Sequence, residues 1–144
     1  MGVSPMSQSI VNLQEAQRRG IANKPAIQGF PYLAETLRRA GVHRNEWHLP
    51  SMQSVYLTDL GPVVHQAEPL VDGYDEIRPF DPELLVAALR ADQAGRSTFV
   101  EFATTAWSAG VVRYAVDLRA RKCVYFGCNG ESFEESYPAV TLPE

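Results

Sequence analysis

The sequence predicts an α+β fold, built as a tandem duplication of a helix-helix-β-meander unit with two helices and three antiparallel strands in each copy. Three observations support this prediction. A segment of 32 residues recurs at a constant offset of 69, a helical apolar pattern precedes a glycine in each copy, and the apolar period then changes from 3.6 to 2. Because a meander with two short helices is a small unit, we expect the two copies to share one core.

The duplication relates residues 30–61 to residues 99–130 without a gap. Chance matching at roughly 6% per position, as average composition implies, would give about two identities. The identical pairs include Phe30/Phe99, Ala34/Ala103, Ala40/Ala109, Gly41/Gly110, Val42/Val111, Arg44/Arg113, Leu49/Leu118, Val55/Val124, Tyr56/Tyr125 and Gly61/Gly130. Convergence of turn residues would explain the glycines but not the Val-Tyr pairs, so a repeated segment is the preferred interpretation.

We expect one domain, residues 1–144, in which a first repeat (8–67) and a second repeat (81–138) flank a connector (68–80). The surrounding region, residues 59–83, contains seven acidic residues, one arginine and several prolines. This composition disfavours helices and strands and predicts a solvated linker. A docking strip for a basic partner is the alternative interpretation.

Two helices are expected at the start of the second copy. Asp81 as N-cap and Pro82 at the first helical position begin one of them. Thr98 and Glu101 have the spacing of a capping box, which begins the other. Gly110 can then supply a left-handed C-terminal cap.

The first copy follows the same logic. A helix with a polar start is expected over about residues 9–19, and Gly20 is expected to end it. A second helix opens at Pro31 and ends before Gly41.

Three strands are expected after each of these two helix pairs. Apolar and polar residues alternate most clearly in residues 112–118, which is typical of a strand with one buried face. The expected strands cover residues 44–49, 53–58, 63–67, 112–118, 123–126 and 132–137.

The composition excludes several classes of protein. The chain has 144 residues, of which 45% are hydrophobic, and a net charge of -4, which argues against a dedicated nucleic-acid binder. No segment approaches the ~18 apolar residues of a membrane span, and residues 1–8 lack the features of a secretory leader. Two cysteines form no disulfide framework, so a reduced cytoplasmic setting is expected. No cofactor fingerprint or metal-ligand spacing is present, so neither a cofactor nor a metal is expected.

Several segments carry motifs of a known family. They are residues 80–93, the Ala-Gly-x-x-x-Tyr motif at residues 109–114, and the Tyr-x-Gly-x-x-Gly-Glu motif at residues 125–131. On these motifs the chain resembles the YbcV-like family of uncharacterised bacterial proteins, often labelled phage envelope protein. The resemblance covers about residues 13–138 and implies an α+β domain, with no established reaction. In the first copy, Asn45 and His48 replace the motif's tyrosine and aspartate.

Four polar residues are candidates for acid–base chemistry. His48 is the repeat partner of Asp117, and His65 is the repeat partner of Glu134. If a twofold axis relates the copies, these side chains could meet in a cleft, where an imidazole beside a carboxylate can transfer protons. The alternative is that all four lie on the solvated face of the sheet.

The candidates for ligand binding are Arg44, Arg113, Tyr56 and Tyr125, which are identical between the copies. A guanidinium kept at equivalent points could bind an anion or a carboxylate ligand. An ion pair with Glu46 or Asp117 on the same strand face is the preferred interpretation. The tyrosines are most simply anchors of the core.

The sequence therefore favours a soluble cytoplasmic module that binds a small-molecule ligand or a protein. A homodimer is an open alternative for the partner, whereas nucleic acid and membrane are not expected. Two other functions are kept: a small enzyme with acid–base chemistry in a cleft between the repeats, and a phage-derived structural protein. The lack of a recognisable catalytic motif counts against the enzyme.

Overall fold

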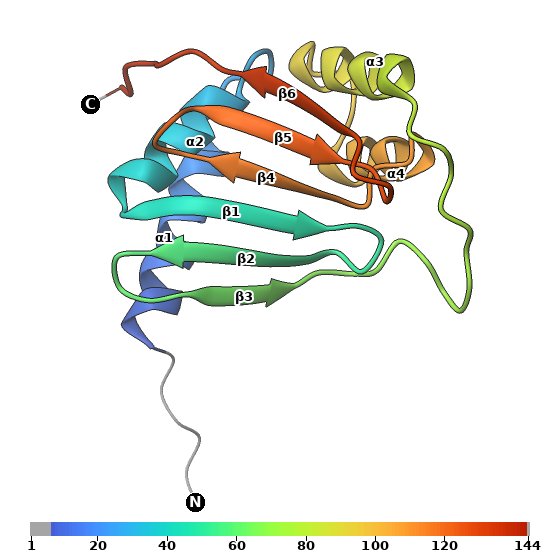
Figure 1. Cartoon of the computed structure of the whole chain (residues 1–144). Coiled ribbons are helices and arrows are strands. Elements are labelled where there is room, and N and C mark those ends of the chain that lie inside the picture. The colour runs from blue at the N-terminus through green and yellow to red at the C-terminus, as the bar shows by residue number, and fades with distance from the viewer. Residues whose placement is uncertain (1–6, 144) are drawn as a thin grey trace, which may run out of the picture.

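The computed structural model describes residues 7–143 and confirms the α+β class (Figure 1). The first six residues, within the region where no secretory leader is expected, lie outside the described residues, as does residue 144. The elements are α1 (Gln8–Asn23), α2 (Phe30–Arg39), β1 (Val42–His48), β2 (Gln53–Thr58), β3 (Val63–Gln66), α3 (Pro82–Gln93), α4 (Phe99–Ser108), β4 (Arg113–Asp117), β5 (Lys122–Phe126) and β6 (Ser132–Ser136). Two helices and three strands therefore occur in the same order twice.

The strands form one antiparallel sheet in the order β3-β2-β1-β4-β5-β6. The two meanders join where β1 pairs with β4. Arg44 lies opposite Asp117 and His48 lies opposite Arg113, so Glu46 and Ala115 occupy the centre of the ladder. Arg44 and Arg113 are repeat partners, and so are His48 and Asp117, because each two are 69 residues apart. Exchanging the copies therefore turns the first pair into the second, and the register at this junction is symmetric about its centre.

Equivalent turns have equivalent backbones in the two halves. Positive φ angles occur at three pairs of positions that are each 69 residues apart. They are Gly41 (93°) and Gly110 (84°), Met52 (60°) and Arg121 (55°), and Gly61 (129°) and Gly130 (86°). This agreement is compatible with the duplicated unit predicted from the sequence.

The third strand departs from the constant offset. His65 lies opposite Ser54, but Glu134 lies opposite Val124, on the other face of the sheet. The residue in the place of His65 is Glu135, because the hairpin between β5 and β6 is one residue longer than that between β2 and β3. The expected partnership of His65 with Glu134 is therefore wrong by one residue.

The predicted helix starts are confirmed at α3 and α4. The Asp81 side chain accepts a hydrogen bond from the Leu84 amide, and Thr98 and Glu101 form the capping box. The predicted end of α1 is wrong, because the helix continues past Gly20 to Asn23. A Cβ at Gly20 would lie 2.5 Å from the Leu33 Cδ1, so this glycine permits α1 to pack closely on α2.

The core lies between the helices and one face of the sheet. In Figure 1 the four helices lie behind the sheet, and its front face is uncovered. The side chains of Tyr56, Tyr114 and Tyr125 point to the helix side and are buried. The connector contains no helix or strand, but Asp75 in it accepts a 2.8 Å hydrogen bond from the indole of Trp107. Among the described residues, no helix is long and apolar enough to cross a membrane.

Candidate functional site

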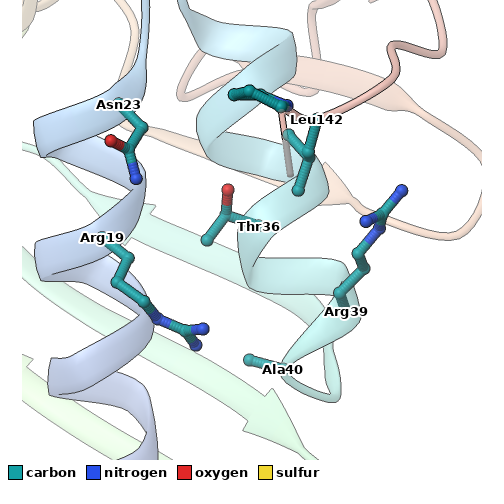
Figure 2. Close-up of a pocket in the computed structure, with 7 residues that line it drawn as sticks. Arg19, Asn23, Thr36, Arg39, Ala40 and Leu142 are labelled. Carbon is teal, nitrogen blue, oxygen red and sulfur yellow. The ribbon is translucent and has the colours of Figure 1, made fainter.

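A groove of about 350 Å³ lies beside the α1–α2 helix pair, where α1 approaches α2 at Gly20 (Figure 2). Its walls come from both helices and from the C-terminal segment that passes over α2. The lining residues are Arg19, Asn23, Thr36, Arg39, Ala40, Leu142 and Pro143. The first half of the chain thus supplies the polar residues of the groove, and the end of the chain supplies an apolar wall.

The side chains of the groove come from successive turns of the two helices. Figure 2 shows Arg19 extending from α1 towards Ala40 at the end of α2, and Thr36 pointing into the space between the helices. The Thr36 hydroxyl donates a 3.0 Å hydrogen bond to the Tyr32 carbonyl, so its oxygen can still accept one. Arg39 extends along α2 towards the C-terminal segment near Leu142.

An ion cluster on α2 holds Arg39 in place. Glu35 accepts two hydrogen bonds of 2.7 Å from the Arg38 guanidinium and one of 3.0 Å from the Arg39 Nε. The hydrogen bonds from Arg38 lower the pKa of Glu35 to about 2, with a further contribution from Arg39 and against the opposing effect of burial. Because only the Nε of Arg39 donates to Glu35 among the described residues, both Nη groups can bind a ligand.

Arg19 carries the second positive charge of the groove. Within residues 7–143, no carboxylate lies within 4.0 Å of its guanidinium, whereas the neighbouring Arg18 is paired with Glu15. The groove therefore presents two guanidinium groups, an amide from Asn23 and a short apolar wall. Guanidinium groups bind carboxylates and phosphates through paired N–H donors, so this arrangement suits an anionic group attached to a small apolar body.

The structure does not bring His48 and Asp117 together. They lie at opposite ends of the β1–β4 ladder, with His48 opposite Arg113 and Asp117 opposite Arg44. Asp117 also accepts hydrogen bonds from the backbone amides that follow it, at residues 119 and 120. The twofold relation that was expected to unite the pair therefore separates it, because equivalent residues of antiparallel strands lie at opposite ends.

His65 and Glu134 are also apart. Each is exposed on an edge strand, and the two strands lie at opposite edges of the sheet. The histidine that does contact a carboxylate is His43, whose Nε2 lies 2.6 Å from Asp59 Oδ1 and 3.4 Å from Arg119 Nη2. Neither of the two described pockets is lined by these residues.

The two arginines identical between the copies lie on the uncovered face of the sheet. Arg44 forms a 3.0 Å ion pair with Glu46, as the strand periodicity predicted. Arg113 instead stacks 3.8 Å above the ring of Phe126. Their partners therefore differ, although their positions are equivalent.

Tyr56 and Tyr125 are buried in the core, so neither side chain is placed to bind a ligand at the surface. Burial raises the pKa of Tyr56, and hydrogen bonds with Ser54, Gln17 and Asn45 oppose this effect. Burial raises the pKa of Tyr125 well above its usual value, and the thiol of Cys123 is its neighbour.

Sequence reasoning missed Arg19 and Arg39. Each is the second residue of an Arg-Arg pair in a helix of the first copy. At an offset of 69, these pairs are replaced by Ala-Ala at residues 87 and 88 and by Trp-Ser at residues 107 and 108. This difference between the copies is the signal in the sequence that marks the two arginines.

Comparison with known proteins identifies relatives along most of the chain. Residues 19–135 match the family described as a protein of unknown function, DUF1398. An uncharacterised protein of Mycobacterium bovis, Mb2035, is 59% identical over 135 residues, which cover 94% of this chain and 82% of the relative. The uncharacterised proteins MT2067 and Rv2012 of Mycobacterium tuberculosis match with the same identity and coverage.

Proposed function

We propose that this chain, which belongs to the DUF1398 family of proteins of unknown function, is a binding module for a small organic anion. The carboxylate or phosphate of the ligand would contact Arg19 and Arg39, and its apolar part would lie against Leu142. The observation that carries the proposal is that two guanidinium groups flank one groove with an apolar wall.

The size and the charge of the site support this proposal. A volume of about 350 Å³ falls at the lower end of the range, roughly 300–1,000 Å³, that small-molecule sites occupy. Residues 1–58, which form most of the groove, contain six basic and three acidic residues, although the whole chain is acidic. A local positive potential attracts anions to this half of the molecule.

Other functions have less support. Acid–base catalysis by His48 and Asp117 would need them in contact, and the β1–β4 register separates them. The matched family carries no description of a virion role, so the phage label adds no mechanism. A cytoplasmic setting belongs to the proposal, because both Cys123 and Cys128 are unpaired, as is usual for proteins in a reducing compartment.

Titration with three probes tests the proposal: inorganic phosphate, phenyl phosphate and benzoate, monitored by the shifts of backbone amide resonances. We expect phenyl phosphate or benzoate to shift amides of α1 and α2, and inorganic phosphate alone to bind more weakly. The double substitution Arg19→Ala and Arg39→Ala should weaken this binding at least about tenfold, because the charge-assisted hydrogen bonds are lost.

The matched control is Arg18→Ala, which removes an exposed arginine of α1 that does not line the groove. It should bind the probes like the unsubstituted protein. Shifts outside α1 and α2, or equal affinity of the double variant and the control, would contradict the proposed site.

A further inference from the structure

The sheet face opposite the helices, here called the open face, carries a group of apolar side chains. Because side chains alternate along a strand, the residues next to the buried tyrosines point to this face. The apolar members of the open face are Val55, Leu57, Val64, Ala115, Val124 and Phe126. Val64 is 60% exposed and Leu57 is 42% exposed, so water contacts a part of the sheet that is well suited to packing.

The strand register gathers the apolar group into one row, with one pair of strands on each side of β1. Val64 pairs with Val55, Ala115 pairs with Val124, and Glu46 alone lies between these two pairs. The carboxylate of Glu46 is compensated by its 3.0 Å ion pair with Arg44. Covering the row removes water from this ion pair, and the apolar contacts on both sides must offset that desolvation cost.

The charges on the open face are complementary to those of a second copy in one orientation. A twofold axis along the strands, between β1 and β4, places Asp117 of one copy over Arg44 of the other. The same operation places Val124 over Val55 and Ala115 over Glu46. It also places Lys122 over Leu57 and Glu134 over Val64, near the outer strands, where the charged ends can reach solvent.

The other in-plane axis, perpendicular to the strands, is unfavourable. It would place Glu46 of one copy over Glu46 of the other, and two facing carboxylates repel.

The available area fits a weak dimer. Six strands about 4.8 Å apart and about 17 Å long give an open face of about 500 Å². Two such faces together approach about 1,000 Å², which is near the lower limit for a specific interface. We therefore expect a dissociation constant in the micromolar range rather than an obligate dimer.

From the apolar row, the charge pattern and the area, we propose that two copies of this chain form a homodimer by stacking their open faces. This interface lies on the side of the sheet opposite the helices and leaves the α1–α2 groove free. The homodimer can therefore exist whether or not the groove binds an anion.

Sedimentation velocity between about 10 µM and about 1 mM tests the proposal, since this range brackets a micromolar dissociation constant. The mass of the unsubstituted protein should rise with concentration towards that of two chains. The substitutions Val55→Lys and Val124→Lys should leave a monomer throughout, because each places a charge where valines of the two copies face each other. Arg44→Asp should weaken the dimer at least about tenfold, because two carboxylates would then face each other.

The matched control is Val100→Lys, which adds the same charge at a 59% exposed valine on α4, away from the open face. It should dimerise like the unsubstituted protein, and circular dichroism should show that every variant is folded. A monomer at all concentrations, or a dimer that tolerates both face substitutions, would overturn the proposal. A dimer abolished by Val100→Lys would place the interface on the helices and would overturn it equally.

Discussion

The helix-facing side chains of β1 and β2 occupy the same places as those of β4 and β5, but their chemistry differs. Three of the equivalent pairs show this: Asn45, Ser54 and Tyr56 in the first half correspond to Tyr114, Cys123 and Tyr125 in the second. The first set forms a buried polar cluster, in which the Asn45 Nδ2 also donates to the Val55 carbonyl. In the second set, the rings of Tyr114 and Tyr125 lie 5.2 Å apart at an interplanar angle of 34°, and burial raises the pKa of Cys123 to about 12.

The outer surfaces of the two halves differ as well. Arg19 and Arg39 border the groove of the first half, whereas Ala88 and Ser108 stand at the equivalent positions of the second. One backbone plan therefore accommodates a polar interior with a basic groove and an aromatic interior without one. The backbone plan is set by turns and apolar spacing, which both halves share, whereas the site depends on residues that only one half has.

The largest expected difference between the halves concerns the two glycines that end α2 and α4. Both have positive φ, but a Cβ at Gly110 would lie 2.6 Å from the carbonyl oxygens of Arg78 and Pro79. At Gly41 the nearest atom is the Asp59 Oδ2, at 2.9 Å, on a side chain that can move. We expect Gly110→Ala to lower the free energy of unfolding by more than about 2 kcal/mol and Gly41→Ala by about 1 kcal/mol, measured by urea unfolding. Equal losses for the two variants would contradict the idea that the connector backbone at Arg78 and Pro79 leaves no room for a side chain at Gly110.

A smaller difference is expected for the equivalent core tyrosines. Tyr56→Phe removes a hydroxyl that bonds with polar side chains in the core, so those groups lose a partner. This should cost about 1 kcal/mol of the free energy of unfolding. Tyr125→Phe removes a hydroxyl next to the Cys123 thiol, a weak hydrogen-bonding group, and should cost less than about 0.5 kcal/mol. Thermal and urea unfolding measure the free energy of unfolding of the two variants. A larger loss for Tyr125→Phe would contradict the polar cluster around Tyr56.

The smallest effect concerns the ion cluster of α2, which has no counterpart in α4 because Thr104 replaces Glu35. Since its folded-state pKa is lowered to about 2, Glu35 stabilises the fold above its ordinary pKa, near 4.5, and this contribution is lost as the pH falls towards 2. Glu35→Gln should therefore lower the free energy of unfolding at pH 7 by less than about 1 kcal/mol, as measured by thermal unfolding. Near pH 2 it should change this free energy little. The substitution Thr104→Val in the second half serves as the control, because its effect should not change with pH. A Glu35→Gln effect that is independent of pH would contradict the ion cluster as its cause.

Much of the fold could be predicted, because its signals are local. The caps at Asp81 and Thr98, the alternation in β4 and the glycines at equivalent turns each reflect conditions within a few residues. The end of α1 was misjudged because Gly20 marks close packing against Leu33, a contact that depends on another helix.

The site was harder to predict, because its residues meet only through tertiary structure. The repeat relates His48 to Asp117 in sequence. In an antiparallel ladder with symmetric register, equivalent positions fall at opposite ends, so residues related by the repeat are kept apart by the fold. Arg19 and Arg39 have no equivalents in the other copy, and Leu142 belongs to neither repeat, so no internal comparison joins them.

The unlike residues at the centre of the β1–β4 ladder bear on how fragments of this protein would assemble. If two copies of residues 81–138 joined through β4 in the same register, Ala115 would face Ala115, and the small side chains would fit together. If two copies of residues 8–67 joined through β1, Glu46 would face Glu46, and the carboxylates would repel. When the separately expressed fragments are mixed, we therefore expect the whole sheet to reassemble. The β1 edge of residues 8–67 can pair with the β4 edge of residues 81–138 without the repulsion that it meets at a second β1 edge.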